Sequence, residues 1–266
     1  FRSGQRLGHG QMLDHMFLDG LEDAFDKGTL MGVFAERTAK KYGFSREAQD
    51  EFAIRSLTRA KKAIEDGSFD AEVTPVTYKN RQREVTVEQD EQPLTANLEK
   101  IPKLRPAFDK DGTVTAANSS SISDGAAALV MMRESTAKKR GLKPIARFLG
   151  HSSFAQEPAW FTTAPVSAIR NLLETVGWNV DDVDLFEINE AFAVVTMAAM
   201  KDLDLPADKV NVHGGACALG HPVGASGTRI LVTLISALQK YGKSRGVASL
   251  CIGGGEATAM AVEVLS

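Results

Sequence analysis

The sequence predicts an α/β protein whose mixed, largely parallel β-sheet carries helices on both faces. From about Lys143 onward, short apolar runs typical of strands alternate with amphipathic stretches typical of helices, and this order builds a sheet covered by helices. Polar and glycine-rich segments follow three of these strands, where open α/β sheets collect their ligands. The composition, 43% hydrophobic and 24% charged over 266 residues, is that of an ordinary folded domain.

The first hundred residues have a different character. Residues 11–67 show a helical pattern, in which Ser45 resembles an N-cap and Gly67 closes the run. Short strand-like pieces at 71–76 and 84–87 follow, among scattered prolines. These features predict an irregular lobe that lies along the surface of the protein.

A polar, serine-rich loop then leads to Asp124-Gly125. The apolar run 126–132 is predicted to be a buried strand, and the basic stretch 133–140 to be a helix.

The remaining elements are expected in a regular order. Strands are predicted at 145–149, 183–188, 210–212, 246–252 and 257–264, and helices at 165–176, 190–200 and 225–241.

Charge and cysteine content exclude several classes of protein. The net charge is −3 and the basic residues are scattered, so neither nucleic acid nor an anionic membrane is an expected partner. The apolar runs are too short to cross a bilayer, and no secretory signal opens the chain. Two cysteines make no disulfide framework, so a cytoplasmic location is expected.

Three strand-end segments carry the candidate chemistry: 189–193, 214–227 and 251–256. Taken singly, Asn189 could be a helix cap, His221 a loop histidine bonded to backbone, and Cys251 an inert core thiol. Taken together, a histidine, a thiol and an amide at one sheet edge form a proton-transfer group. Free N–H groups at Gly253 and its neighbours could stabilise an oxyanion.

A metal site is not expected. His213, Cys217 and His221 are spaced by four, which would align them on one helix. The surrounding glycines and Pro222 argue against a helix there, and a fourth ligand is not evident.

The three strand-end segments closely resemble the signature blocks of thiolases, in particular those of the acetyl-CoA acetyltransferase type. The matching blocks are Asn-Glu-Ala-Phe, Gly-Gly-Ala-Cys-Ala-Leu-Gly-His-Pro-Val-Gly-Ala-Ser-Gly and Cys-Ile-Gly-Gly-Gly. Further matches include Leu-Arg-Pro-Ala-Phe108 and Thr-Ala-Ala-Asn-Ser-Ser120. The resemblance covers essentially the whole chain.

The resemblance implies a two-step acyl transfer, in which a cysteine accepts an acyl group from one CoA thioester and passes it to a second. His221 would activate that cysteine and, with a water held by Asn189, form an oxyanion hole. Cys251 would be the acid/base at the α-carbon, and the N–H of Gly253 would serve a second oxyanion hole. Coenzyme A thioesters are the substrates, and no further cofactor is implied. Ser120, Phe108 and Phe192 match positions that line the pantetheine and CoA channel.

The resemblance also implies a division of the chain. Residues 1–121 would be the lobe that covers CoA, 122–142 the end of the N-terminal half, and 143–266 the complete C-terminal half. The nucleophilic cysteine would lie in an N-terminal segment outside this sequence, which leaves a large apolar surface exposed. A homodimer or homotetramer is expected.

Two alternatives remain beside the short-chain acetyltransferase. One is a longer-chain 3-ketoacyl-CoA thiolase of β-oxidation, which shares these blocks. The other is a non-catalytic half that binds CoA thioesters and needs a partner chain. Leu30, residues 90–94 and residues 161–162 depart from the pattern of the family, so the CoA-head contacts and the acyl size are left open.

Overall fold

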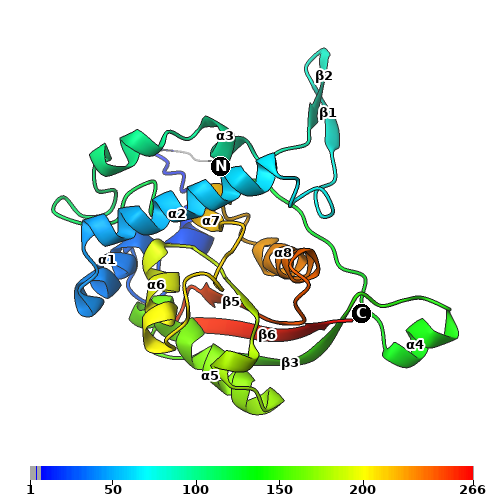
Figure 1. Cartoon of the computed structure of the whole chain (residues 1–266). Helices are drawn as coiled ribbons and strands as arrows, with labels where there is room; N and C mark the ends of the chain where they lie inside the picture. The colour runs from blue at the N-terminus through cyan, green and yellow to red at the C-terminus, as the bar shows by residue number, and fades with distance from the viewer. Residues whose placement is uncertain (1–3, 5–6, 266) are drawn as a thin grey trace.

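The computed structural model describes residue 4 and residues 7–265 of the chain. It shows an irregular, helix-rich lobe packed on a single sheet and its helices (Figure 1). Residues 1–3, 5, 6 and 266 lie outside the described residues.

The sheet has four strands in the order β3-β6-β5-β4. They are β3 (Ala146–Ala155), β4 (Leu185–Ile188), β5 (Arg245–Ile252) and β6 (Glu256–Val264). The sheet is mixed, as predicted, but the expectation of a largely parallel sheet was wrong, because only β4 and β5 pair in parallel. The tight turn at residues 253–255 makes β5 and β6 an antiparallel hairpin, and β3 pairs antiparallel with β6.

Helices cover both faces of this sheet, which confirms the predicted architecture (Figure 1). On one face α5 (Ala164–Val176) packs on residues of β5 and β6, including Val247 and Ala259. On the other face α8 (Ser226–Lys240) packs on Leu185, Ala248 and Val262. Each helix packs on the sheet with one apolar face, as expected for an amphipathic helix that covers a sheet.

The segment between β4 and α8 differs from its prediction. The helix expected at 190–200 is α6 (Ala193–Asp202), and its N-cap is Phe192 and not Asn189. The strand expected at 210–212 is a single bridge between Val210 and Phe186. One helical turn, α7 (Ala216–Leu219), forms despite the flanking glycines that argued against a helix.

The lobe is dominated by two helices, α1 (Met31–Tyr42) and α2 (Arg46–Glu65). Ser45 accepts a hydrogen bond from the N–H of Ala48, which confirms the predicted cap. The shorter elements are the π-helical turn η1 (Phe17–Leu21), α3 (Glu91–Thr95) and the 3-10 helix η2 (Leu98–Lys103). On the sheet side, the short helices η3 (Pro158–Thr163) and η4 (Val180–Asp182) flank α5.

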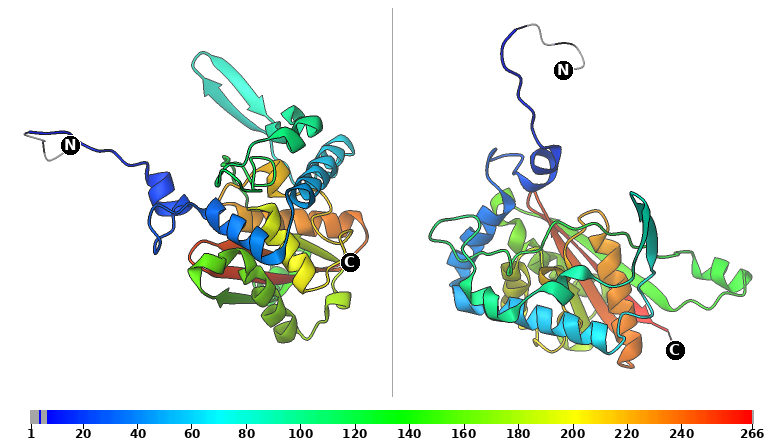
Figure 2. Two further views of the ribbon diagram at one scale, coloured as in Figure 1. Left: turned by 90° about the vertical axis from the view of Figure 1, so that its left-hand side faces the viewer. Right: turned by 90° about the horizontal axis from the view of Figure 1, so that it is seen from above.

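A two-stranded hairpin projects from the lobe (Figure 2). It consists of β1 (Val76–Asn80) and β2 (Arg83–Val87). The strand expected at 71–76 was therefore wrong, because residues 71–75 form turns and coil, whereas the piece expected at 84–87 lies within β2.

The buried strand predicted at 126–132 was also wrong. These residues are irregular, and Val130, Met131 and Met132 are exposed. A strand needs a partner for its backbone hydrogen bonds, and no described segment pairs with this run. The basic stretch that follows does form a helix, α4 (Glu134–Lys139).

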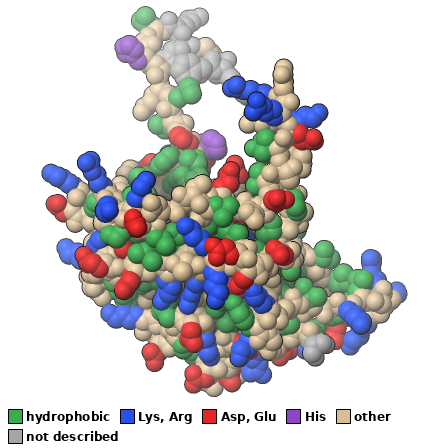
Figure 3. All heavy atoms as spheres, turned by 45° about the horizontal axis from the view of Figure 1, so that its top comes forward, with side chains coloured by type: hydrophobic (Ala, Val, Ile, Leu, Met, Phe, Trp, Pro, Cys, Tyr) green, Lys and Arg blue, Asp and Glu red, His purple; other side chains and the backbone are tan. Residues whose placement is uncertain are grey.

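Acidic and basic side chains are interspersed over the face in Figure 3, consistent with the net charge of −3. Among the described helices, none is both long enough and apolar enough to cross a membrane.

Candidate active site

The carboxyl ends of β4 and β5 lie side by side and bring two candidate residues to one edge of the sheet. The strands pair in register from Leu185–Gly246 to Ile188–Ser249. The N–H of Asn189 continues this ladder by donating to the carbonyl of Ser249, at 2.9 Å. Cys251 follows two residues later on the neighbouring strand, so the predicted edge carries both residues.

His221 reaches the same edge from the loop before α8. Its Nε2 lies 3.4 Å from Nδ2 of Asn189, a long hydrogen-bond contact. The loop is held in place because the N–H of His221 donates to the carbonyl of Ser121 at 3.0 Å.

The other ring nitrogen defines the tautomer of His221. Nδ1 lies 2.6 Å from Oγ of Ser226, and the Ser226 hydroxyl donates to the carbonyl of Pro222 at 3.0 Å. Because a hydroxyl has one proton, Oγ accepts from His221, and Nδ1 carries the hydrogen. Nε2 is then the lone-pair nitrogen that faces Asn189. This arrangement presents a base to the site.

Burial also keeps this ring neutral. It lowers the pKa of His221 from 6.5 to about 4, and the nearby charge of Arg229 acts in the same direction. Asn189 is 1% exposed, and its Oδ1 is buried without a hydrogen-bond partner among the described residues. A buried acceptor of this kind is suited to hold a water molecule.

Glu190 links this edge of the sheet to the lobe through hydrogen bonds. Its carboxyl group accepts hydrogen bonds from the Ser56 hydroxyl at 2.6 Å, the Asn211 amide at 2.9 Å and the N–H of Cys217 at 3.1 Å. Gly215 has no room for a side chain, since a Cβ there would lie 2.4 Å from the Glu190 carboxyl carbon. Glu190 therefore fixes the start of the loop that carries His221.

The three predicted substrate-binding residues meet beside this edge. The Ser120 hydroxyl donates to the carbonyl of Ala191 at 3.0 Å, which places it next to Phe192. The rings of Phe108 and Phe192 make an edge contact with centroids 6.0 Å apart. Gly32 underlies Phe108, where a Cβ would come within 2.3 Å of the ring.

Cys251 lies in the apolar cluster that includes Phe192, with Phe108 packed against it. It is 6% exposed, and burial raises the pKa of its thiol to about 12. The resting form is therefore a thiol, the proton-donating form. Across the described residues, no hydrogen bond joins Cys251 to His221.

Gly253 follows in the turn that links β5 to β6. Gly255, in the same turn, has a φ of 101°, and a Cβ there would lie 2.2 Å from the carbonyl oxygen of Gln156. Only glycine fits that position. The turn therefore has a fixed shape and holds the Gly253 backbone close to Met31.

Cys217 lies buried beneath the start of the loop that carries His221. Its thiol donates to the carbonyl of Glu190 at 3.7 Å, and it packs with Phe52 and Ala193. Burial and the Glu190 carboxyl raise its pKa well above the usual value.

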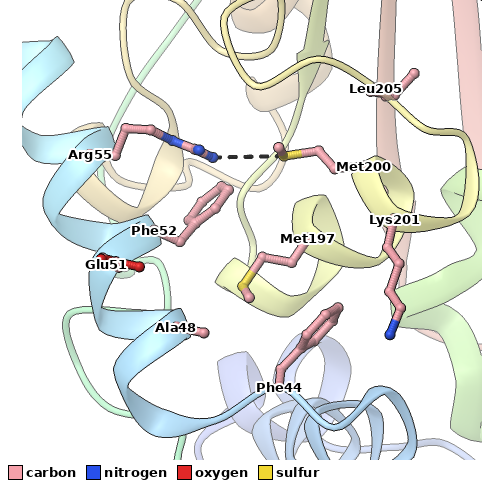
Figure 4. Close-up of a pocket in the computed structure, with 9 residues that line it drawn as sticks. All are labelled: Phe44, Ala48, Glu51, Phe52, Arg55, Met197, Met200, Lys201 and Leu205. Carbon is pink, nitrogen blue, oxygen red and sulfur yellow. Dashed lines mark hydrogen bonds between the residues drawn. The ribbon is translucent and has the colours of Figure 1, made fainter.

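No group of three or more His, Cys, Asp or Glu side chains among the described residues is arranged to hold a metal ion. A groove of about 560 Å³ lies elsewhere, between α2 and α6 (Figure 4). Phe52, Met197 and Met200 line it, and the Arg55 guanidinium lies 3.7 Å from the sulfur of Met200. None of the candidate site residues lines this groove.

Three residues of the site were not predicted from the sequence. Ser226 and Arg229 were placed only within the helix expected at 225–241, and Glu190 only within the helix expected at 190–200. Ser226 and Arg229 share one face of the predicted helix at 225–241. Ser226 and Arg229 could have been predicted from the sequence, because they are polar residues at helical spacing on an otherwise apolar helix.

Comparison with known proteins gives the class of this fold and site. The N-terminal domain model of the thiolases matches residues 1–135, and the C-terminal domain model matches residues 142–264. The chain belongs to the thiolase family.

Individual relatives are acetyl-CoA acetyltransferases. That of Escherichia coli (strain K12) is 50% identical over 266 residues, covering 100% of this chain and 67% of the relative. The cytosolic acetyl-CoA acetyltransferase of Mus musculus is 49% identical, covering 98% of this chain and 66% of the relative. The crystal structure of the Bacillus anthracis acetyl-CoA acetyltransferase superposes with a TM-score of 0.95 at 47% identity, covering 99% of this chain and 67% of that one. The chain thus spans about two thirds of the length of these relatives.

Proposed function

We propose that this chain belongs to an acetyl-CoA C-acetyltransferase, which converts two acetyl-CoA into acetoacetyl-CoA and CoA and catalyses the reverse thiolysis. Relatives of that name match the chain from end to end at about 50% identity, and they do not favour the longer-chain alternative. The single structural observation that supports the proposal is the lone-pair Nε2 of His221 beside the Asn189 amide.

In the first step, an acyl-accepting thiol loses its proton to Nε2 of His221 and attacks the carbonyl of acetyl-CoA. The oxyanion is stabilised by His221 and by a water on Asn189. The departing CoA thiolate takes the proton of the Cys251 thiol, which leaves Cys251 as the thiolate, while Nε2 keeps the proton of the acceptor thiol. Ser226 keeps Nδ1 protonated throughout and leaves Nε2 as the exchanging nitrogen.

In the second step, Cys251 as thiolate removes a proton from the α-carbon of a second acetyl-CoA. The resulting enolate attacks the enzyme thioester and forms acetoacetyl-CoA. The released acceptor thiolate takes its proton back from Nε2, so the ring of His221 returns to its neutral form. The N–H of Gly253 stabilises the enolate oxygen. Phe108, Phe192 and Ser120 line the channel for the pantetheine arm.

The acyl acceptor is neither thiol of this chain. Burial raises the pKa of both Cys217 and Cys251, and the thiolate is the nucleophilic form. We propose that the acceptor comes from a further thiolase segment, that the enzyme is a homodimer or homotetramer, and that it acts in the cytoplasm.

The test is an assay of the complete enzyme for acetoacetyl-CoA formation and thiolysis. His221→Ala is expected to lower kcat by about a hundredfold or more. Acetoacetyl-CoA is expected to outcompete longer 3-oxoacyl-CoA substrates. Full activity of His221→Ala would overturn the assignment of His221, and a preference for long chains would overturn the substrate.

A further inference from the structure

The side chain of Gln92 joins the two segments that hold the backbone of His221. Gln92 lies on α3, and this helix packs on both α2 and α7. Its Nε2 donates to the carbonyl of Cys217, on α7, at 3.1 Å. Its Oε1 accepts a hydrogen bond from the hydroxyl of Ser121. The carbonyl of the same Ser121 receives the N–H of His221 at 3.0 Å. Gln92 is therefore bonded both to the helix before His221 and to the residue that receives its N–H.

The two partners of Gln92 also define the orientation of its amide. A carbonyl oxygen can only accept, so the end of the amide that faces Cys217 is the NH₂ group. The amide oxygen then faces Ser121, and the hydroxyl of Ser121 is the donor of that bond. A single orientation of the side chain thus satisfies both bonds.

The bond from Gln92 to Cys217 ends the helix α7. In a continuing α-helix, the N–H of His221 would donate to the carbonyl of Cys217, four residues earlier. That N–H donates instead to Ser121, and the NH₂ group of Gln92 takes its place on the carbonyl. Gly220, with a φ of 87°, turns the chain out of the helix at this point. The hydrogen bonds from His221 to Ser121, from Ser121 to Gln92 and from Gln92 to Cys217 therefore close a ring around the end of α7.

The two chain segments beside this ring lie in close contact. A Cβ on Gly220 would lie 2.1 Å from Oγ of Ser123, and one on Gly125 would lie 2.7 Å from Cγ of Pro222. Residues 121–125 and 220–222 therefore have little freedom to shift against each other while the ring is closed. Since the ring of His221 extends from this backbone toward the candidate site, its position depends on the same hydrogen bonds.

We propose that Gln92 is a positioning residue for the reaction, which sets the place of the His221 ring opposite Asn189. It does so by capping the carbonyl of Cys217 and by binding the hydroxyl of Ser121. The inference rests on the proposed function of His221 as a base. It gives the lobe, through α3, a part in placing the base at the edge of the sheet.

The first test compares the steady-state kinetics of the complete enzyme and its variants. Gln92→Met keeps the length of the side chain but makes neither bond. It is expected to lower kcat by about tenfold and to change the KM for acetyl-CoA by less than about twofold, because a displaced base slows proton transfer while the substrate contacts remain. Gln92→Glu cannot donate to the carbonyl of Cys217 and is expected to lose as much. Gln239→Met, the same substitution at an exposed position of α8, is the matched control and should keep the unmodified rate.

Ser121→Ala opens the same ring at its other bond and is expected to lower kcat by a similar factor. Because both substitutions open one ring, the double variant Gln92→Met/Ser121→Ala should be no slower than the slower single variant. Losses that multiply would overturn the proposal, since the two side chains would then act separately. An unchanged kcat in Gln92→Met and Gln92→Glu would also overturn it, and so would a raised KM with kcat retained, which would assign Gln92 to substrate binding.

The second test is amide hydrogen exchange, which does not depend on activity. In Gln92→Met the N–H of His221 is expected to exchange about tenfold faster, while the N–H groups of β5 exchange at their former rates. Unchanged exchange at His221 would overturn the proposal, and so would an equal acceleration in β5, because Gln92 would then act on the fold as a whole. If Gln92→Met does not fold, Ser121→Ala decides by the same two measurements. Failure of the proposed function would appear separately, as an active His221→Ala enzyme, whereas the exchange result for Gln92→Met would stand.

Discussion

The side-chain amide of Asn189 lies 3.4 Å from Nε2 of His221, although the two residues are 32 positions apart in the chain. The contact joins the end of β4 to the loop before α8. It exists because Asn189 continues the β4–β5 ladder while Ser121 and Ser226 hold His221 from two other sides. The site is therefore defined by backbone pairing, and each side chain within it has few alternative positions.

Ser226→Ala is expected to lower kcat/KM of the complete enzyme by about tenfold to a hundredfold, with little change in stability. Without Oγ as acceptor, Nδ1 of His221 has no fixed partner, and a fraction of the rings carries the proton on Nε2. Ring 15N shifts should show that second tautomer. Ser244→Ala, at an exposed serine, is the matched control. An unchanged rate together with an unchanged tautomer would contradict the role given to Ser226.

The two thiols are expected to respond differently to mutation. Cys251→Ala should lower the turnover of the complete enzyme by orders of magnitude, because it removes the acid/base at the α-carbon. Cys217→Ala should retain most activity, since this thiol makes only a weak contact to the carbonyl of Glu190. Steady-state kinetics of both variants decide the ranking, and equal losses would show it to be wrong.

Glu190→Gln is expected to lower the free energy of unfolding by about 1–3 kcal/mol, because its new NH₂ group faces donors that have then lost an acceptor. The hydroxyl of Ser56 and the N–H of Cys217 both point at the same oxygen, Oε2. Urea unfolding measures the change, and Glu51→Gln, at an exposed position on α2, is the control. Equal free energies of unfolding for the two variants would mean that the hydrogen bonds of Glu190 do not stabilise the fold.

Stability at acidic pH should depend on His213. Its ring is 2% exposed, lies between Phe69 and Tyr241, and contacts the Tyr241 hydroxyl at 3.2 Å. Burial lowers its pKa from 6.5 to about 4. The unfolded chain therefore binds the proton first as the pH falls, and stability is lost between pH 6.5 and 4.

The variant that isolates this effect is His213→Gln, which can still bond Tyr241 but does not titrate. Over that interval the free energy of unfolding of the unmodified chain should fall by up to about 1.4 kcal/mol per pH unit more than that of the variant. Urea unfolding at several pH values gives both slopes. Parallel slopes would exclude His213 as the source.

The strength of the local pattern determined how far the fold could be predicted. The helix at 225–241 and the strands at 246–252 and 257–264 were located to within a residue or so, because periodicity is a local property. The run 126–132 was misassigned because a strand exists only where a partner pairs with it. The direction of pairing was misjudged for a similar reason, since it depends on the turn at 253–255 and not on the strands themselves.

The candidate site, like the fold, could be predicted only where a local sequence pattern defines it. Asn189, His221 and Cys251 could be predicted because strand ends and glycine-rich loops are visible in the sequence. Their supporting partners could not, because the Ser56–Glu190 hydrogen bond spans 134 positions of the chain. No local pattern records such a contact. The catalytic roles of these residues remain predictions.

The most direct measurement is mass-spectrometric mapping of the purified chain after incubation with labelled acetyl-CoA. The proposed mechanism needs a thiolate that becomes acylated, and both thiols of this chain are buried with raised pKa values. The expected result is no acetyl adduct on Cys217 or Cys251 and no acetoacetyl-CoA formed. Stoichiometric acetylation of either cysteine, with turnover to acetoacetyl-CoA, would contradict the proposal that the acyl acceptor lies outside these residues.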